Sequence, residues 1–172
     1  MLQYAWGMLI RPEDAADAQS IRSLVTAAFW DAPHSSGTEA DIVDALRAGS
    51  ALTLSLVAIT GGVIVGYVAF SPVMVAGQMP GWFGLGPVAV ERSQRRQGIG
   101  RLLIEDGLSR LRAQGAGGCV VLGDPAYYGR FGFEPDPALT LAGVPAEYFQ
   151  RLRLQEEQPA GEVLYHPAFS ST

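Results

Sequence analysis

The 172-residue sequence predicts one domain of the α+β class (mixed α/β), in which helices and strands share a core. Three observations support this. Apolar residues recur at helical spacing in the first fifty positions, two strand-length apolar runs flank the Gly-Gly pair at 61–62, and two more flank an amphipathic segment at 98–114. The length suits one domain, without repeats or linkers. The domain is expected over residues 8–169, with residues 1–7 as an N-terminal extension.

The first fifty residues predict a short strand, two helices and a connecting loop. Asp14 can cap the first helix, because its carboxylate accepts hydrogen bonds from free backbone N–H groups. Within that helix Ile21, Leu24, Val25 and Ala28 recur at the spacing of one buried face. The predicted elements are the strand Leu9–Arg11, the helix after Asp14, the loop Trp30–Gly37 and a second helix that begins at Thr38 and ends at Gly49.

The remaining sequence predicts mainly strands. Pro72 cannot donate a backbone hydrogen bond, so the strand that contains it should lie partly at an edge or bend there. The run Trp82–Val90 is almost continuously apolar, as in a central strand buried on both faces. The other expected elements are the strands Leu52–Thr60 and Val63–Val75, the helix Gly98–Gln114, the strand Cys119–Leu122, short helices at Tyr127–Arg130 and Ala146–Phe149, and strands at Arg151–Gln155 and Glu162–His166.

Composition excludes several kinds of protein. The net charge of −5 argues against nucleic-acid binding, which depends on cationic side chains that neutralise phosphates. No apolar run approaches the ~20 residues of a membrane helix. The single cysteine, Cys119, permits no internal disulfide and favours the reducing cytoplasm. The two histidines, His34 and His166, are far apart, so no metal is expected. A monomer or homodimer is expected.

The segment 85–103 predicts an anion site. A buried strand leads through a turn to Arg95-Arg96-Gln97-Gly98-Ile99-Gly100-Arg101 at the start of the long helix. Helix N-termini bind anions, and Gly98 and Gly100 leave the backbone bare for a pyrophosphate. A dinucleotide fingerprint would need glycine where Leu103 stands, and a P-loop would need a lysine, which the chain lacks. The alternative is an ordinary strand–turn–helix whose glycines only tighten the turn.

The segment 118–133 carries a second pattern. A strand ends at Gly123-Asp124-Pro125, and Tyr127-Tyr128 precedes Gly132-Phe133. Asp124 is interpreted as a helix cap, with proline in the first helical turn. Cys119 lies among apolar strand residues, which favours an inert buried thiol over a nucleophile. Tyr127 and Phe131 are interpreted as packing residues.

Together the two segments resemble the GNAT superfamily of N-acetyltransferases, and within it the predicted acetyltransferases of the YhbS type. Arg95-x-x-Gly98-x-Gly100 and Tyr128-x-x-x-Gly132-Phe133 match its signatures, and the resemblance spans most of residues 8–169. It implies a central, mostly antiparallel twisted sheet of about six to seven strands with a splayed central pair, flanked by about four helices. It also implies that acetyl-CoA donates an acetyl group to a primary amine of a small molecule or peptide, by direct attack in a ternary complex, with coenzyme A as product.

The resemblance assigns roles to individual residues. Tyr128 would protonate the leaving thiolate, and the Val88 N–H would face the thioester oxygen. The cofactor-binding residues would be Val88, Ala89, Val90, Arg95, Arg96, Gln97, Gly98, Ile99, Gly100 and Arg101.

The general base and the acceptor stay open. Glu39, Asp41, Glu91, His34 and a water chain are the alternatives for the base. The resemblance places the acceptor pocket among the first two helices, their loop and the C-terminal segment, which supply Phe29, Trp30, Asp31, His34, Glu39 and Tyr148 and would suit a cationic amine with an apolar part. A catalytically silent acyl-CoA-binding module is the alternative function; it would need the arginine-glycine loop but not Tyr128.

Overall fold

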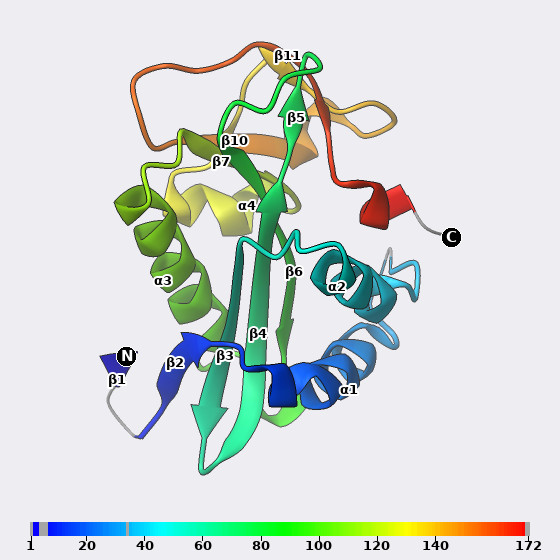
Figure 1. The fold of residues 1–172 in the computed structure, drawn as a ribbon, viewed down its shortest axis with the longest axis vertical. Helices are drawn as coiled ribbons and strands as arrows, with labels where there is room; N and C mark the ends of the chain where they lie inside the picture. Colours follow the sequence, from blue (N-terminus) through cyan, green and yellow to red (C-terminus); the bar gives the residue numbers. More distant parts are fainter. Residues whose placement is uncertain (1, 4–6, 34, 171–172) are drawn as a thin grey trace.

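The computed structural model describes residues 2–3, 7–33 and 35–170, and its centre is one mixed sheet (Figure 1). All neighbouring strands in it are antiparallel except β6 and β7, which confirms the mostly antiparallel sheet. Its strands, in spatial order, are β1 (Leu2–Gln3), β2 (Leu9–Pro12), β3 (Leu54–Thr60), β4 (Val63–Pro72), β6 (Trp82–Val90), β7 (Gly118–Leu122), β10 (Phe149–Arg153) and β8 (Glu134–Pro135).

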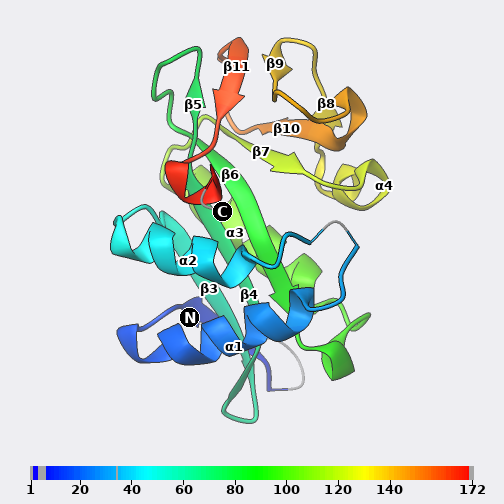
Figure 2. The ribbon, with the colours of Figure 1, turned by 90° about the vertical axis from the view of Figure 1, so that its right-hand side faces the viewer.

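Helices cover both faces of this sheet. Figures 1 and 2 show α3 on one face, with α1 and α2 together on the other. One buried cluster lies between α3 and the sheet and includes Phe70 and Leu103; a second lies under α1 and α2 and includes Val25 and Tyr67. The helices are α1 (Ala18–Phe29), α2 (Glu39–Ala48), α3 (Ile99–Ala113) and α4 (Pro125–Tyr128), with 3₁₀ turns η1 (Ala15–Asp17), η2 (Arg92–Gln94), η3 (Gly129–Phe131), η4 (Ala146–Tyr148) and η5 (Pro167–Ser170).

The two central strands separate halfway along their length. β7 pairs with β6 only at residues 82–84, after which the two strands diverge (Figure 2). On its other side β6 stays paired with β4 as far as Val90, with one shift of register between Val68 and Phe70. Such an irregularity bends a strand. The splayed central pair is therefore present, and within the described part of the chain no strand pairs with this edge of β6 from Leu85 onward.

Most elements lie where the sequence predicts them, with three differences. The expected strand Val63–Val75 is interrupted: β4 ends at Pro72, and β5 (Met74–Val75) joins β11 (Gly161–Leu164) and β9 (Leu139–Thr140) in a separate small sheet. The two-residue strands β8 and β9 were not predicted. Within the expected N-terminal extension, β1 pairs with β2 at the edge of the main sheet.

Gly107 sets the distance between α3 and the sheet. A Cβ at this position would lie 2.3 Å from the Phe70 ring, and Phe70 is fully buried. We expect Gly107→Ala to lower the free energy of unfolding by about 1–3 kcal/mol, because overpacking outweighs the better helix propensity of alanine. Gly129→Ala is the matched control, since nothing lies within 4 Å of its Cβ position. Urea denaturation measures both, and equal stabilities would contradict the prediction.

Candidate active site

Beyond Gly84 the strands β6 and β7 diverge, and we call the space between them the opening. The edge of β6 presents polar backbone groups to this opening. The Glu91 N–H donates to the Val65 carbonyl at 2.8 Å, and from there the register with β4 runs without a shift back to Val88. Residues of an antiparallel strand turn their N–H and C=O groups alternately toward and away from the neighbour. Counting back from Glu91, Ala89 is turned toward β4, whereas Val88 and Val90 are turned away from it. Val88 thus offers both its N–H and its carbonyl to the opening, and Val90 offers its N–H, because its carbonyl accepts from Arg95 at 3.3 Å. Ala89 offers neither group.

The turn after β6 begins with a capped 3₁₀ turn and delivers the backbone to α3. The Glu91 carboxylate accepts from the Ser93 backbone N–H at 2.7 Å and from the Ser93 hydroxyl, and these bonds lower the pKa of Glu91. Arg96 has φ +65° and Gly98 has φ +84°, both in the left-handed region. Gly98 is the N-cap of α3, so the first free N–H groups of that helix face outward at this point.

A cavity of about 440 Å³ lies at this helix N-terminus, and arginines dominate its lining. It is enclosed by Val90, Arg95, Arg96, Gly98, Ile99, Gly100, Arg101, Tyr127 and Arg130. Four guanidinium groups around unpaired helical N–H groups form a site for a polyanion such as a pyrophosphate. Gln97 is exposed and does not line the cavity, and the Ile99 side chain is buried in the core below.

Three of these arginines are held by different contacts. Arg95 donates to the Ala28 carbonyl at 2.9 Å and to the Val90 carbonyl at 3.3 Å, so it fastens the loop to the end of α1. Arg101 pairs with Glu105 at 2.8 Å on the exposed surface. Arg130 donates to the Tyr127 carbonyl, and its guanidinium lies 4.6 Å from the centre of the Tyr127 ring. Sequence reasoning missed Arg130; its position two residues after the Tyr127-Tyr128 pair was the available signal.

Gly100 brings the helix close to the opening. A Cβ at this position would lie 3.4 Å from the Tyr127 hydroxyl oxygen and 3.6 Å from the Val90 side chain. An alanine fits there, whereas a larger side chain would fill the space between the helix, β6 and Tyr127. Tyr127 packs edge-on against Tyr128 and Phe131, as expected, but it also lines the arginine cavity.

Tyr128 lies at the other end of the opening. Its ring packs over Gly123, where a Cβ would come within 2.4 Å of it, and edge-on against Phe133. Burial raises the pKa of Tyr128 to about 12, because the ionised phenolate is poorly solvated there. No described residue accepts a hydrogen bond from its hydroxyl, which leaves that proton free for a ligand.

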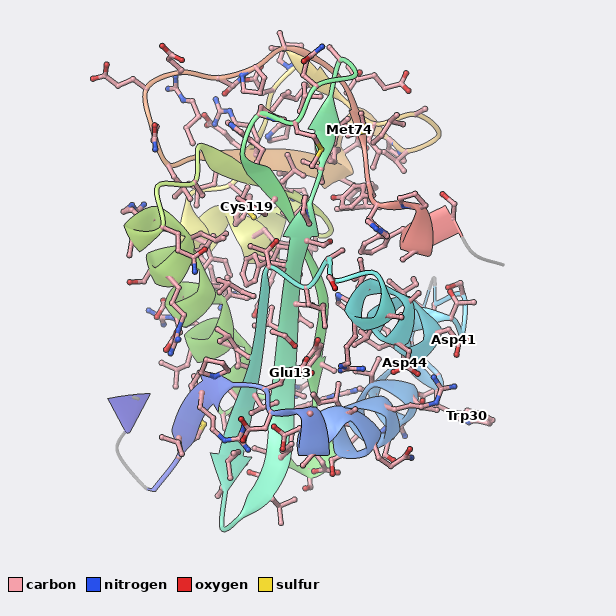
Figure 3. The ribbon with its side chains drawn as sticks, viewed as in Figure 1. Glu13, Trp30, Asp41, Asp44, Met74 and Cys119 are labelled. Carbon is pink, nitrogen blue, oxygen red and sulfur yellow. The ribbon has the colours of Figure 1, made fainter. Side chains whose placement is uncertain are left out.

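Tyr128 and Val88 line a second cavity of about 520 Å³. Of the residues expected at the acceptor pocket, Phe29 and Glu39 line it. Trp30 is 82% exposed and points outward from the end of α1 (Figure 3), and Asp31 pairs with Arg92. Tyr148 does not line this cavity, and His34 lies outside the described residues. The complete lining is Phe29, Ser36, Glu39, Ile42, Leu85, Gly86, Pro87, Val88, Leu122, Tyr128, Leu141, Tyr165 and Phe169.

The carboxylates considered as general base differ in position. Glu39 lines the second cavity and accepts from the Ser35 hydroxyl at 2.8 Å. Asp41 pairs with Arg22 at 2.9 Å, and Figure 3 shows it on the outer side of the helices. Glu91 caps the turn after β6. The geometry therefore favours Glu39 among the three.

The structural interpretations of Asp124 and Cys119 are confirmed. The Asp124 carboxylate accepts from the Ala126 N–H at 2.9 Å at the start of α4. Cys119 is fully buried, and burial raises the pKa of its thiol well above the usual range. Within the described residues, no cluster of three or more His, Cys, Asp or Glu side chains is placed to hold a metal ion, and no helix is long and apolar enough to cross a membrane.

Comparisons with known proteins give the same fold and family. The model of the acetyltransferase (GNAT) family matches residues 19–133. The uncharacterized N-acetyltransferase YhbS of Escherichia coli K12 is 46% identical over 128 residues, which is 74% of each chain. A crystal structure of YhbS from E. coli in complex with CoA has a TM-score of 0.89 at 39% identity and covers 99% of this chain and 96% of that one.

A second solved structure is similar over nearly its whole length. The GNAT family acetyltransferase from Brucella melitensis, in complex with acetyl-CoA, has a TM-score of 0.86 at 48% identity and covers 95% of this chain and 99% of that one. Fold and sequence thus agree along most of the molecule. The chain belongs to the GNAT family and is an acyltransferase of the N-acetyltransferase class.

Proposed function

We propose that the protein transfers an acetyl group from acetyl-CoA to a primary amine by direct attack within a ternary complex. One observation carries the proposal: the splayed edge of β6 runs between the arginine cavity, lined by Val90 and Tyr127, and the second cavity, lined by Val88 and Tyr128. The relatives from E. coli and B. melitensis were solved with CoA and acetyl-CoA. The proposed location is the cytoplasm.

The residues present fit acetyl-CoA. The helix N-terminus and Arg95, Arg96, Arg101 and Arg130 suit its pyrophosphate. Because Gly100 has no side chain, the adjoining part of the pantetheine chain could approach the helix there. The backbone N–H and carbonyl of Val88 and the N–H of Val90 suit the amides of pantetheine, which would lie along β6 like an added strand. Bound there, acetyl-CoA supplies an activated acyl thioester.

The chain's own groups handle charge and protons. The Val88 N–H is turned away from β4 into the opening, and in this proposal it donates to the thioester oxygen, where negative charge develops. Glu39, directly or through water, takes the proton that the amine loses when its nitrogen bonds to the acetyl carbon. Tyr128 gives its hydroxyl proton to the departing thiolate and regains one from solvent. Each proton thus has a donor and an acceptor.

The alternative is a silent acyl-CoA-binding module, which would use only the arginine cavity. The second cavity favours the enzyme, because a module that only binds acyl-CoA needs neither the Tyr128 hydroxyl nor the Glu39 carboxylate in that cavity. A thiol-release assay with acetyl-CoA distinguishes the two. Amine-dependent release of CoA, across a panel of amines, polyamines, amino acids, aminoglycosides and peptides, supports the enzyme; tight CoA binding without release from any of them supports the module.

The raised pKa of Tyr128 predicts the shape of the pH profile. A tyrosine donates only when protonated, and a pKa of about 12 keeps Tyr128 protonated throughout the usual assay range. The acceptor nitrogen must lose its ammonium proton before it attacks, so kcat/KM should rise from about pH 6 toward about pH 10 as that proton is lost more easily. No falling limb from Tyr128 is expected below about pH 11. A falling limb near pH 9 that disappears in Tyr128→Phe would contradict this.

A further inference from the structure

We infer that the acceptor is a primary monoamine on an apolar body, with neither a carboxylate nor a second ammonium group. The inference rests on the proposed function and narrows it from amines in general to one class. It comes from the second cavity, whose described lining contains one carboxylate, two phenols and otherwise apolar side chains and backbone, apart from the Ser36 hydroxyl.

Glu39 is the single charged side chain in that lining. It is the first residue of α2, and its Oε1 accepts from the Ser35 hydroxyl at 2.8 Å and from the Ser36 N–H at 3.3 Å. These bonds fix the carboxylate, and the helix N-terminus stabilises its negative charge. One anchored anion matches one ammonium group.

The other two ionisable groups carry no charge. Burial raises the pKa of both Tyr128 and Tyr165, so both remain neutral donors. Tyr165 lies against Gly84, where a Cβ would come within 2.5 Å of its ring, and so closes the cavity at the point where β6 leaves β7. Neither phenol neutralises a carboxylate.

Apolar side chains form the walls. Phe29 comes from α1 and Ile42 from α2. The C-terminal segment adds Tyr165 and Phe169, whose ring centres lie 5.2 Å apart. Leu85, Leu122 and Leu141 complete the apolar set. Removal of each acceptor methylene from water into such surroundings is favourable, so the cavity favours an aryl or alkyl body.

The same walls reject further charges. The arginines gather in the other cavity, and no described cation lines this one, so an acceptor carboxylate would be buried without a partner. A second ammonium group would likewise lack a counterion. An unpaired buried charge costs several kcal/mol, far more than the methylenes around it return.

Calorimetry on the CoA-saturated protein tests this without turnover. The titrants are two matched pairs: phenethylamine against phenylalanine, which adds a carboxylate, and hexylamine against hexamethylenediamine, which adds an ammonium group. We expect the monoamine of each pair to bind at least tenfold more tightly. Glu39→Gln should weaken phenethylamine binding at least tenfold. Asp41→Asn is the matched control, because it removes a carboxylate two residues along α2 that pairs with Arg22 outside the cavity.

A second variant should remove most of the preference for phenethylamine over phenylalanine. Leu141→Arg adds a cation to the lining and should bring phenylalanine to within about threefold of phenethylamine, with CoA affinity unchanged. Equal or tighter binding of phenylalanine or of the diamine by the unmodified protein overturns the inference, as does the absence of binding by either monoamine. The proposed function fails separately, if acetyl-CoA does not bind or no amine releases CoA from it.

Discussion

Replacing Gly98 or Gly100 with valine is expected to weaken acetyl-CoA binding at least tenfold, a loss of about 1.4 kcal/mol or more. The two variants act differently. At Gly100 the added methyl groups would occupy the space beside Tyr127 and Val90, where the proposal has the cofactor approach the helix. At Gly98 the obstacle is conformational, because a φ of +84° strains any L side chain and most of all a β-branched one. Calorimetric titration with acetyl-CoA measures both.

Gly115→Val controls for the strain. Gly115 follows the opposite end of α3, has φ +82° and has nothing within 4 Å of its Cβ position, as Gly98 does. Gly98→Val and Gly115→Val should therefore lose similar stability, but only the former should lose affinity. Gly100→Ala makes contacts no closer than 3.4 Å in the free protein and should keep it folded. Unchanged affinity in folded Gly98 and Gly100 valine variants would remove the anion site from the proposal.

Local order along the chain made the core of the site predictable. Val88 and Val90 lie on β6, Arg95–Arg101 lie on the turn and first residues of α3 that follow it, and Tyr128 lies on α4 after the next strand. Each group belongs to a short local motif, and the resemblance of these motifs to the GNAT signatures predicted their roles. The hairpin at Gly61-Gly62 and the cap at Asp124 were predictable for the same reason, since each depends on a few neighbouring residues. The contact of Arg95 with the Ala28 carbonyl joins segments 67 residues apart, and no local pattern encodes it.

The second cavity, proposed to hold the acceptor, was less predictable because residues from separate parts of the chain line it. Phe29 and Glu39 were expected there and line it, whereas Trp30 is exposed. Successive residues of a helix lie about 100° apart around its axis, so Phe29 and Trp30 need not face the same cavity. Leu141 and Tyr165 come from stretches without clear periodicity, whose short strands β9 and β11 are stabilised by pairing with distant segments. Their role in the cavity depends on tertiary packing, which also places Arg130 beside Tyr127.

Tyr128→Phe is expected to lower kcat by roughly 10²–10⁴-fold, the usual range for a positioned general acid. The affinity for acetyl-CoA should stay within about threefold, because the ring keeps its contacts with Gly123 and Phe133 and only the hydroxyl is lost. If the hydroxyl acts only in the transition state, kcat and kcat/KM should fall together. Water that enters in its place would bring the effect toward the lower bound.

Two further variants make the result specific to Tyr128. Tyr148→Phe removes a hydroxyl from a residue that is 44% exposed and lines neither cavity near the opening, so kcat should not change. Tyr165→Phe removes the other phenol that lines the second cavity. If its loss of kcat exceeds that of Tyr128→Phe, the proton donor is Tyr165. A loss confined to KM for acetyl-CoA in Tyr128→Phe would instead make the hydroxyl a binding group, and full turnover by that variant would exclude it as the acid.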